Sequence, residues 1–202
     1  AITAADNAMT FQTVVKTVAH RNGLYADFSA KPLDNEPGNG FHINISVRPN
    51  DNSRNLYYVI AGILEKVEEM TAFLNPNENS YKRFGQNKAP GFISWSNENR
   101  SQLVRIPAAI GEYHRAELRS PDPAANPYLA FALIIYAGLY GLQNKSGMPA
   151  AANINLYKAD AETLAKFRKL PQDLSSACRI AAASEFIKAH VPAAILDIYC
   201  NQ

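Results

Sequence analysis

A strictly alternating stretch, GNGFHINISVRP (residues 38–49), is the feature that most constrains how this chain can fold. Apolar side chains occupy one parity of the stretch: Phe41, Ile43, Ile45 and Val47. A repeat of two residues is the pattern of a β-strand with one buried face. The other face, which includes His42, ordinarily meets water, but a histidine beside an asparagine and a serine is also suited to line a pocket. The stretch therefore predicts a strand and leaves the role of its polar face open.

Further short segments have the composition of strands. They are residues 24–30, 92–96, 101–107 and 113–120, and the first of them is expected to pair with residues 38–49. A long polar loop, residues 75–91, has proline near both ends. Loops of this length in a compact domain are usually functional or disordered, so this loop is a candidate for a functional role.

Helical patterns surround these strands. Apolar residues repeat at helical spacing from Thr3, which with Asp6 resembles a capping pair, to a stop at Asn22 and Gly23. A second helix is expected over residues 55–73.

A third helix is predicted from its start signals. Asn126 and Pro127 suit the N-cap and the first helical position, and the run that follows, YLAFALIIYAGLYGL, is apolar nearly all round. Because a bilayer span needs about 20 apolar residues, this run is expected to be a helix buried behind the sheet, and no membrane partner is expected. Residues 160–202 are expected to form two or three scaffold helices with breaks at Pro171 and Pro192. The patterns together predict an α+β fold, a mainly antiparallel sheet with helices on its outer face.

The charge balance excludes one class of function. The 202 residues include 20 Lys and Arg against 18 Asp and Glu, and no basic stripe of the kind that binds nucleic acid. No Walker loop, dinucleotide fingerprint or nucleophile motif is present in the sequence. Cys178 and Cys200 lack metal-binding spacing, and no signal peptide precedes the first helix, which favours a reduced, cytoplasmic setting. The helical pattern begins almost at Ala1, as expected of a piece of a longer protein.

Charged residues gather on the predicted strands. Arg115, Glu117 and Arg119 share one parity of a single strand, while Arg100 and Arg105 flank the strand before it. Taken alone, such charges are explained by ordinary surface ion pairs. Several arginines near one sheet also suit phosphate or carboxylate ligands, because a guanidinium group binds an oxyanion with two hydrogen bonds at once.

His42 and Glu117 are the only well-placed pair of candidate metal ligands in the sequence. A lone histidine on a strand is often structural, and one nitrogen with one carboxylate cannot hold a metal ion unaided. The residues by themselves therefore predict an oxyanion-binding sheet with an incomplete metal site.

Four blocks of the sequence resemble the C-terminal part of the catalytic domain of glutamine synthetase. The blocks are GNGFHINIS, NPNENSYKRF, NRSQLVRIP and RAELRSPDPAANPYLAFA, which occur in the family order over residues 38–145. The first helix and the segment after it also fit, so the resemblance covers nearly the whole chain. It implies that residues 1–202 are the C-terminal portion of this catalytic domain, with a curved sheet that is part of a barrel. The N-terminal domain and the upstream catalytic segments of the family would be absent.

The resemblance implies roles for individual residues around glutamate and a metal ion. His42 and Glu117 would ligate the divalent ion, Mg²⁺ or Mn²⁺, that lies nearer the nucleotide phosphates. Gly38 and Arg83 would contact the substrate glutamate, and Arg119 would contact it beside the metal.

A second set of residues would surround ATP. Arg100, Arg105 and Arg115 would contact the phosphates, with Arg100 as the catalytic residue closest to the group in transfer, and Ser46 would lie near the nucleotide. The implied reaction uses ATP to convert the side-chain carboxylate of glutamate into an acyl phosphate, which ammonia attacks to give glutamine. Family members complete their sites between the subunits of a ring-shaped homo-oligomer and with upstream segments, so this chain alone is expected to be inactive.

The sequence departs from the family pattern at two places. Asn44 stands where a second histidine is common, and Lys88 begins Lys-Ala-Pro where the family's flap loop usually has Glu-Ala-Pro. The fragment NINLYKAD resembles a tyrosine loop that some bacterial members modify with a nucleotide, although a structural role is expected for Tyr157. Two alternatives to glutamine synthesis stay open: a γ-glutamyl ligase that uses an organic amine, and a non-catalytic binding or regulatory module.

Overall fold

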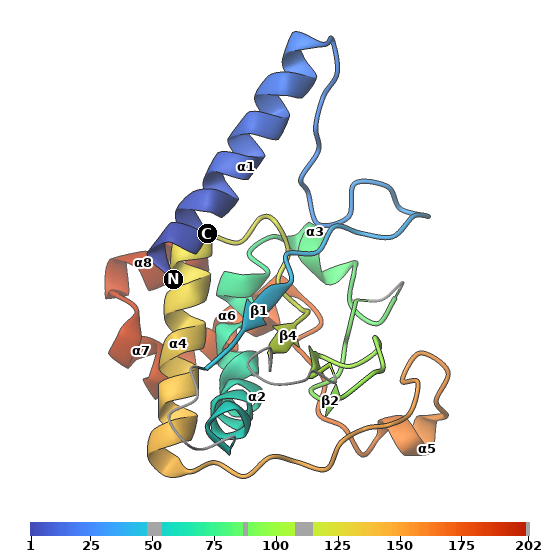
Figure 1. Cartoon of the computed structure of the whole chain (residues 1–202), viewed down its shortest axis with the longest axis vertical. Coiled ribbons are helices and arrows are strands. Elements are labelled where there is room, and N and C mark those ends of the chain that lie inside the picture. Colours follow the sequence, from blue (N-terminus) through green and yellow to red (C-terminus); the bar gives the residue numbers. More distant parts are fainter. Residues whose placement is uncertain (48–53, 87–88, 108–114, 201–202) are drawn as a thin grey trace.

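The computed structural model describes residues 1–47, 54–86, 89–107 and 115–200, which form a four-stranded sheet and a set of helices (Figure 1). The strands are β1 (Ile43–Ile45), β2 (Trp95–Ser96), β3 (Val104–Arg105) and β4 (Ala116–Leu118). The helices are α1 (Ile2–Arg21), α2 (Arg54–Leu74), α3 (Glu78–Tyr81), α4 (Pro127–Asn144), α5 (Ala161–Leu164), α6 (Leu174–Ala183), α7 (Glu185–His190) and α8 (Ala193–Cys200). The predicted α+β class is confirmed.

The sheet has the strand order β1-β4-β3-β2 and is mixed. β4 pairs antiparallel with β1 and β3, whereas β2 and β3 run parallel. One face is formed by three aligned, buried residues, Ile43, Leu118 and Val104. The opposite face is formed by Asn44, Glu117 and Arg105. The alternation seen in the sequence therefore separates a core face from a polar face.

The structure corrects several expectations about the sheet. Residues 24–30 form no strand, and their predicted pairing with residues 38–49 reduces to a backbone bond from Asn39 N to Ala30 O at 2.9 Å. Because no ladder holds that segment, Leu24 and Tyr25 stay exposed. The other predicted strands shorten to the two or three residues that find a partner. The described residues form an open sheet and not a barrel.

Side chains of α2 and α4 pack with the buried face of the sheet in one core. The two helices approach closely because glycines face each other at the contact. A Cβ atom on Gly62 would lie 2.2 Å from the carbonyl oxygen of Ala137, and one on Gly141 would lie 2.1 Å from that of Tyr58. The spans predicted for both helices are confirmed within two residues at the ends given.

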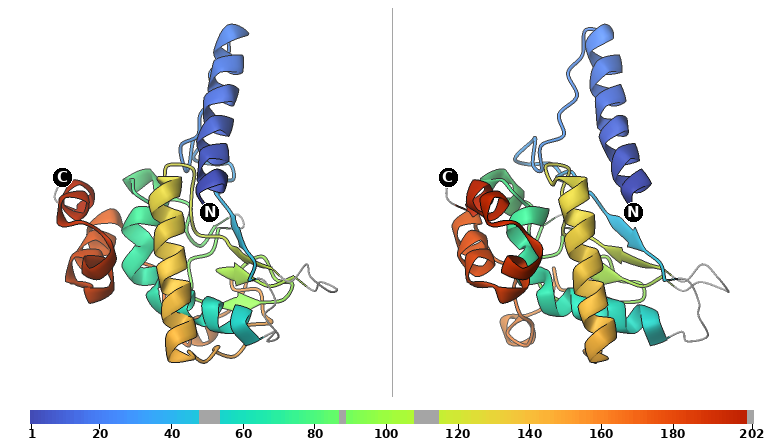
Figure 2. Two further views of the ribbon diagram at one scale, coloured as in Figure 1. Left: turned by 60° about the vertical axis from the view of Figure 1, so that its left-hand side comes forward. Right: turned by 90° about the vertical axis from the view of Figure 1, so that its left-hand side faces the viewer.

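The start of α4 is as predicted, and its burial is as predicted on one side. The Asn126 side chain accepts hydrogen bonds from Tyr128 N at 3.0 Å and Leu129 N at 3.2 Å, with Pro127 as the first helical residue. The expected burial behind the sheet holds for one side of α4 only, since Tyr128, Ile135 and Leu139 on the other side are between 45% and 46% exposed. α2 covers only one side of α4, and the other side lies on the surface (Figure 2).

Helix α1 projects away from the sheet (Figures 1 and 2). It begins at Ile2, before Thr3, and no side chain caps it. The predicted capping pair of Thr3 and Asp6 is therefore wrong, because both residues lie inside the helix. Asp6 instead accepts a hydrogen bond of 2.6 Å from the hydroxyl of Tyr128 at the start of α4.

The long loop and the C-terminal region contain more helix than predicted. Residues 75–91 include the short helix α3, and residues 160–200 form four helices in place of two or three. The breaks at Pro171 and Pro192 are confirmed, and Ser184 adds one by capping α7 through a bond from Ile187 N at 3.0 Å. In the described part of the chain, no helix has the length and apolarity that a membrane span requires.

Candidate functional site

An open cleft of about 420 Å³ lies over the polar face of the sheet. Its lining comes from the segment before β1, the turn after α3, the segment between β2 and β3, and the strands β3 and β4 with their flanks. The predicted site residues that line it are Gly38, His42, Arg83, Arg100, Arg105, Glu117 and Arg119. The polar face of the alternating stretch therefore faces a cleft at His42.

Glu117 is the centre of this cleft. Its Oε1 atom lies 3.0 Å from His42 Nδ1, while its Oε2 atom lies 3.1 Å from Arg119 Nη1 and 3.4 Å from Arg105 Nε. The sheet register explains the meeting, because Arg105 on β3 is directly opposite Glu117 on β4. One carboxylate is thus surrounded by three nitrogen groups from three neighbouring segments.

The electrostatics of the cleft favour an ionised carboxylate and a neutral imidazole. Burial raises the pKa of Glu117, but Arg119, His42 and Arg105 together outweigh it and hold that pKa below its ordinary value. Burial, and then the charge of Arg119, lowers the pKa of His42, against the opposing pull of Glu117. These protonation states are the ones that metal ligands require.

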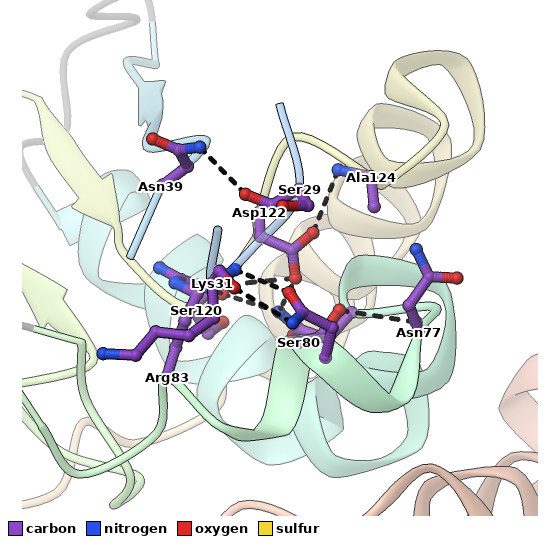
Figure 3. Close-up of polar contacts among 11 residues, drawn as sticks. Ser29, Lys31, Asn39, Asn77, Ser80, Arg83, Ser120, Asp122 and Ala124 are labelled. Carbon is purple, nitrogen blue, oxygen red and sulfur yellow. Dashed lines mark hydrogen bonds and ion pairs between the residues drawn. The ribbon is translucent and has the colours of Figure 1, made fainter. Parts of the chain in front are cut away.

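Arg83 reaches the cleft from the turn after α3 (Figure 3). Its Nη1 atom donates to Ser120 O at 3.0 Å and lies 3.9 Å from Asp122 Oδ2. The side chain passes close to Gly38, where a Cβ atom would lie 2.7 Å from Arg83 Cγ. Glycine is therefore needed at position 38 for the arginine side chain to take this path.

The histidine–carboxylate pair suits a divalent cation by type but not by number. Mg²⁺ binds six oxygen or nitrogen atoms, and His42 with Glu117 supplies only part of such a set. Within residues 1–47, 54–86, 89–107 and 115–200, no group of three or more histidine, cysteine or acidic residues could hold a metal ion. The pair can serve as a partial site that other ligands complete, as the sequence predicts.

Two predicted site residues do not line the cleft. Ser46 is exposed and lines a different, mainly apolar groove between β1 and α4. It has the parity of His42, but four residues of extended chain separate the two by about 13 Å. Arg115 is exposed before β4, with its side chain outside the cleft lining. Lys88 lies outside the described residues.

The structure also adds two residues that the sequence did not single out, and it shows the surroundings of Tyr157. Ser120 and Asp122 are buried beside Arg83. The phenol oxygen of Tyr157 is buried, and burial raises the pKa of Tyr157 to about 12 although Arg119 and Arg83 act in the opposite direction. Asp122 lies in one of the family-like blocks, between two prolines, and a carboxylate in such a position was the available signal.

A cleft that gathers four arginines around a histidine–carboxylate pair on the polar face of a sheet has the chemistry that suits phosphate and carboxylate groups. The family model of the glutamine synthetase catalytic domain matches residues 1–202. The chain therefore belongs to the glutamine synthetase catalytic-domain family.

Relatives with curated names agree with this assignment. The chain is 44% identical over 199 residues to a glutamine synthetase of Methanosarcina mazei. The aligned region covers 91% of this chain and 44% of that protein. It is 40% identical over 203 residues to a glutamine synthetase of Staphylococcus aureus. That aligned region covers 93% of this chain and 46% of the other protein. The chain thus spans about half the length of the curated relatives it matches.

Solved structures share the fold. GmaS in complex with ADP superimposes with a TM-score of 0.84 at 32% identity, over 98% of this chain and 49% of that one. Ligand-free GmaS gives a TM-score of 0.82 at 32% identity, over 98% of this chain and 48% of that one. The arrangement of sheet and helices is therefore that of the corresponding half of GmaS.

Proposed function

We propose that this chain is the C-terminal part of the catalytic domain of an ATP-dependent ligase that amidates the side-chain carboxylate of glutamate with ammonia. The observation that carries the proposal is the convergence of seven predicted residues on one cleft. Membership of the family supports it. Because the chain spans about half of its relatives, the activity belongs to a complete protein that carries it.

Glutamate would be held by Arg83, Arg119 and Gly38. Arg83 and Arg119 each offer a guanidinium group that can bind a carboxylate with paired hydrogen bonds. Both side chains are at most 4% exposed, so little conformational freedom remains to be lost when the substrate binds.

The phosphates would lie along Arg100 and Arg105. In the first step the glutamate side-chain oxygen bonds to the γ-phosphorus of ATP as the bond to the β-phosphate oxygen breaks, giving an acyl phosphate and ADP. In the second step ammonia attacks the acyl carbon, loses a proton and expels inorganic phosphate. Arg100, the exposed arginine at the rim, would neutralise charge on the group in transfer.

His42 and Glu117 would hold Mg²⁺ or Mn²⁺ together with ligands from other parts of the complete protein, and the bound ion would supply positive charge beside the phosphates. In this chain the role of Arg105 is to keep Glu117 ionised and fixed at the cleft. Ser46 and Arg115 are proposed to reach the nucleotide only in the complete protein. A ring-shaped homo-oligomer with shared sites, a barrel completed by upstream strands and a cytoplasmic setting are part of the same proposal.

A second candidate is favoured by one residue. Lys88 stands where the family pattern has a glutamate that helps to attract ammonium and remove its proton, and a cation there would repel ammonium. A γ-glutamyl ligase for an organic amine is therefore the alternative. The test compares kcat/KM for ammonium and a panel of organic amines in the complete protein and in its Lys88→Glu variant. A strong preference for an organic amine that Lys88→Glu shifts toward ammonium would replace glutamine synthesis by the alternative.

The proposed function itself is tested by the products. The complete protein, incubated with ATP, glutamate, ammonium and Mg²⁺ or Mn²⁺, is expected to form glutamine, ADP and phosphate in equal amounts. Binding of ADP and glutamate without turnover of any amine would instead identify a binding or regulatory module.

A further inference from the structure

We propose that Asp122 and Asn75 are positioning residues that fix the guanidinium group of Arg83, so that one side of it is anchored in the protein and the other is presented to an anionic substrate. The inference rests on the proposed function only for the identity of that anion, a carboxylate of glutamate. Neither residue lines the cleft, so both would act through Arg83.

The anchor is a set of buried hydrogen bonds. Asn75 and Asp122 are each 0% exposed, and Ser120 is 1% exposed. The Asn75 Nδ2 atom donates to Ser120 O at 2.8 Å and to Asp122 Oδ2 at 2.8 Å. The other carboxylate oxygen, Oδ1, accepts from Ala124 N at 2.9 Å (Figure 3). Both oxygens of Asp122 are therefore held, and its carboxylate has a single orientation.

Arg83 meets this set with one of its terminal nitrogens. Nη1 donates to Ser120 O, the same oxygen that accepts from Asn75, and lies within 3.9 Å of Asp122 Oδ2. Nη2 lies on the cleft side, because a Cβ atom on Gly40 would be 3.3 Å from Nη2 and 2.8 Å from His42 Nε2. The planar guanidinium group thus joins the anchor to the cleft, and its orientation follows from the anchor.

The negative charge of Asp122 compensates the buried positive charge of Arg83. Burial lowers the pKa of Arg83, while Asp122 opposes that shift and the nearby Arg119 reinforces it. A buried cation without a negative partner is unfavourable, so Asp122 makes it possible to keep an ionised arginine beneath the cleft. An amide in its place would keep the shape and lose this compensation.

The network also connects the two arginines proposed to bind glutamate. Ser120 follows Arg119 in the chain, and Asn75 follows the last residue of α2. The Asp122 N–H donates to Leu74 O at 3.3 Å, and Arg119 N donates to Leu103 O at 3.0 Å beside the sheet. The end of α2, the segment before α4 and the turn after α3 are therefore held together, which fixes the distance between Arg83 and Arg119.

The test compares Asp122→Asn with Asp160→Asn. Asp160 is exposed and caps α5 by accepting from Thr163 N, a bond that an amide oxygen can replace, so this control also removes one carboxylate. In the complete protein, Asp122→Asn is expected to raise the KM for glutamate roughly tenfold or more, as expected for a lost charge-assisted contact, with the KM for ATP nearly unchanged. A lower kcat with an unchanged KM for glutamate, or an equal rise in Asp160→Asn, would overturn the inference.

A second readout does not depend on activity. In the complete protein, phenylglyoxal labelling of Arg83, followed by peptide mass spectrometry, is expected to be slow, because the Arg83 side chain is 2% exposed. Asp122→Asn is expected to accelerate labelling of Arg83 but not of Arg100. Equal Arg83 rates in wild type and variant would overturn the positioning role.

The inference stays testable if the Asp122→Asn variant does not fold, and also if the wild-type protein makes no glutamine. If Asp122→Asn does not fold, as judged by circular dichroism, Asn75→Ala takes its place with the same expectations, because it removes only the amide that holds the carboxylate. A wild-type protein that makes no glutamine refutes the proposed function, and the labelling rates alone then decide the positioning inference.

Discussion

At the scale of single residues, Glu117 decides the chemistry of the cleft. It lies between His42, Arg105 and Arg119 at distances of 3.0 to 3.4 Å, and its carboxylate is only partly exposed. Neighbouring positive charge favours its ionised form, and the same carboxylate keeps those cations in place. Removal of its charge should therefore change the site far more than the fold.

Glu117→Gln, which keeps the size of the side chain, is expected to abolish metal-supported activity of the complete protein and to leave its circular dichroism spectrum unchanged. The reason is that an amide is a poor ligand for Mg²⁺ or Mn²⁺ and does not neutralise the arginines. Metal titration and rate measurements check this, with Glu162→Gln on the exposed helix α5 as the control. Normal metal affinity and rate in Glu117→Gln would show that the ligand assignment is wrong.

His42 should make stability depend on pH. Its pKa in the folded protein is lowered from 6.5, so below that pH the unfolded chain takes up a proton before the folded one does. The free energy of unfolding is therefore expected to fall as pH decreases from about 6.5 to the lowered pKa. Glu117, whose pKa is lowered from 4.5, adds a further loss below that value.

Urea unfolding of the chain at a series of pH values from about 7.5 to 4 would measure this dependence. This range of pH includes the ordinary pKa values of histidine and glutamate side chains. His42→Gln is expected to flatten the curve from about pH 6.5 down to the lowered pKa of His42, and to leave the loss at lower pH. His20→Gln on the exposed end of α1 is the matched control. An unchanged slope in His42→Gln would contradict the prediction.

At the scale of the elements, the contact between α2 and α4 supports the sheet from behind. Gly62 and Gly141 let the two backbones approach, so the helices are in contact where any side chain would keep them apart. Their apolar side chains continue into the core beneath β1, β3 and β4. The position of the polar face, and thus of the cleft, depends on this contact.

Gly62→Ala is expected to destabilise the chain by about 1–3 kcal/mol, the usual cost of overpacking, because its Cβ would lie 2.2 Å from the backbone oxygen of Ala137, which cannot turn aside as the end of a flexible side chain can. Gly147→Ala is the control, since a Cβ there meets nothing within 4 Å. Thermal and denaturant unfolding of both variants measure the difference. Equal stabilities would show that the helix contact tolerates a side chain.

At the scale of the whole molecule, the chain spans about half the length of the curated relatives it matches. The apolar residues Phe11, Val14 and Val18 on α1 are 52% to 62% exposed. Within its described residues, no group of three or more histidine, cysteine or acidic side chains could hold a metal ion. We therefore expect the predicted metal site of His42 and Glu117 to need ligands from outside this chain before it can hold a divalent ion.

The isolated 202-residue chain is expected to form no glutamine from ATP, glutamate and ammonium with Mg²⁺ or Mn²⁺. An underligated metal leaves the charge of the transferring phosphate poorly neutralised. A coupled assay for ADP and a direct assay for glutamine check this. Metal-dependent glutamine formation above background would contradict it.

The sequence predicted those features that depend on near neighbours along the chain. The parity of residues 38–49, the cap at Asn126 and the breaks at Pro171 and Pro192 were predicted in this way. Period, capping and proline geometry act within a few residues, so they can be recognised without knowledge of the fold.

The family resemblance added the list of site residues, and most of these do meet at one cleft. Ser46 and Arg115 show its limit, because correct parity or proximity in the chain did not bring their side chains to the cleft. Residues on the same face of a strand can lie far apart along its length. Only the register between neighbouring strands decides which residues meet.

The sequence by itself determined which residues alternate, where helices begin and break, and that arginines, a histidine and a glutamate share polar faces. Only the tertiary structure decided that residues 24–30 form no strand, that one side of α4 is exposed, and that Asn75 and Asp122 hold Arg83. A strand needs a partner ladder, burial needs a covering element, and this hydrogen-bond network needs groups 37 to 47 residues apart in the chain to meet. Such encounters depend on the packing of distant segments, which no local pattern specifies.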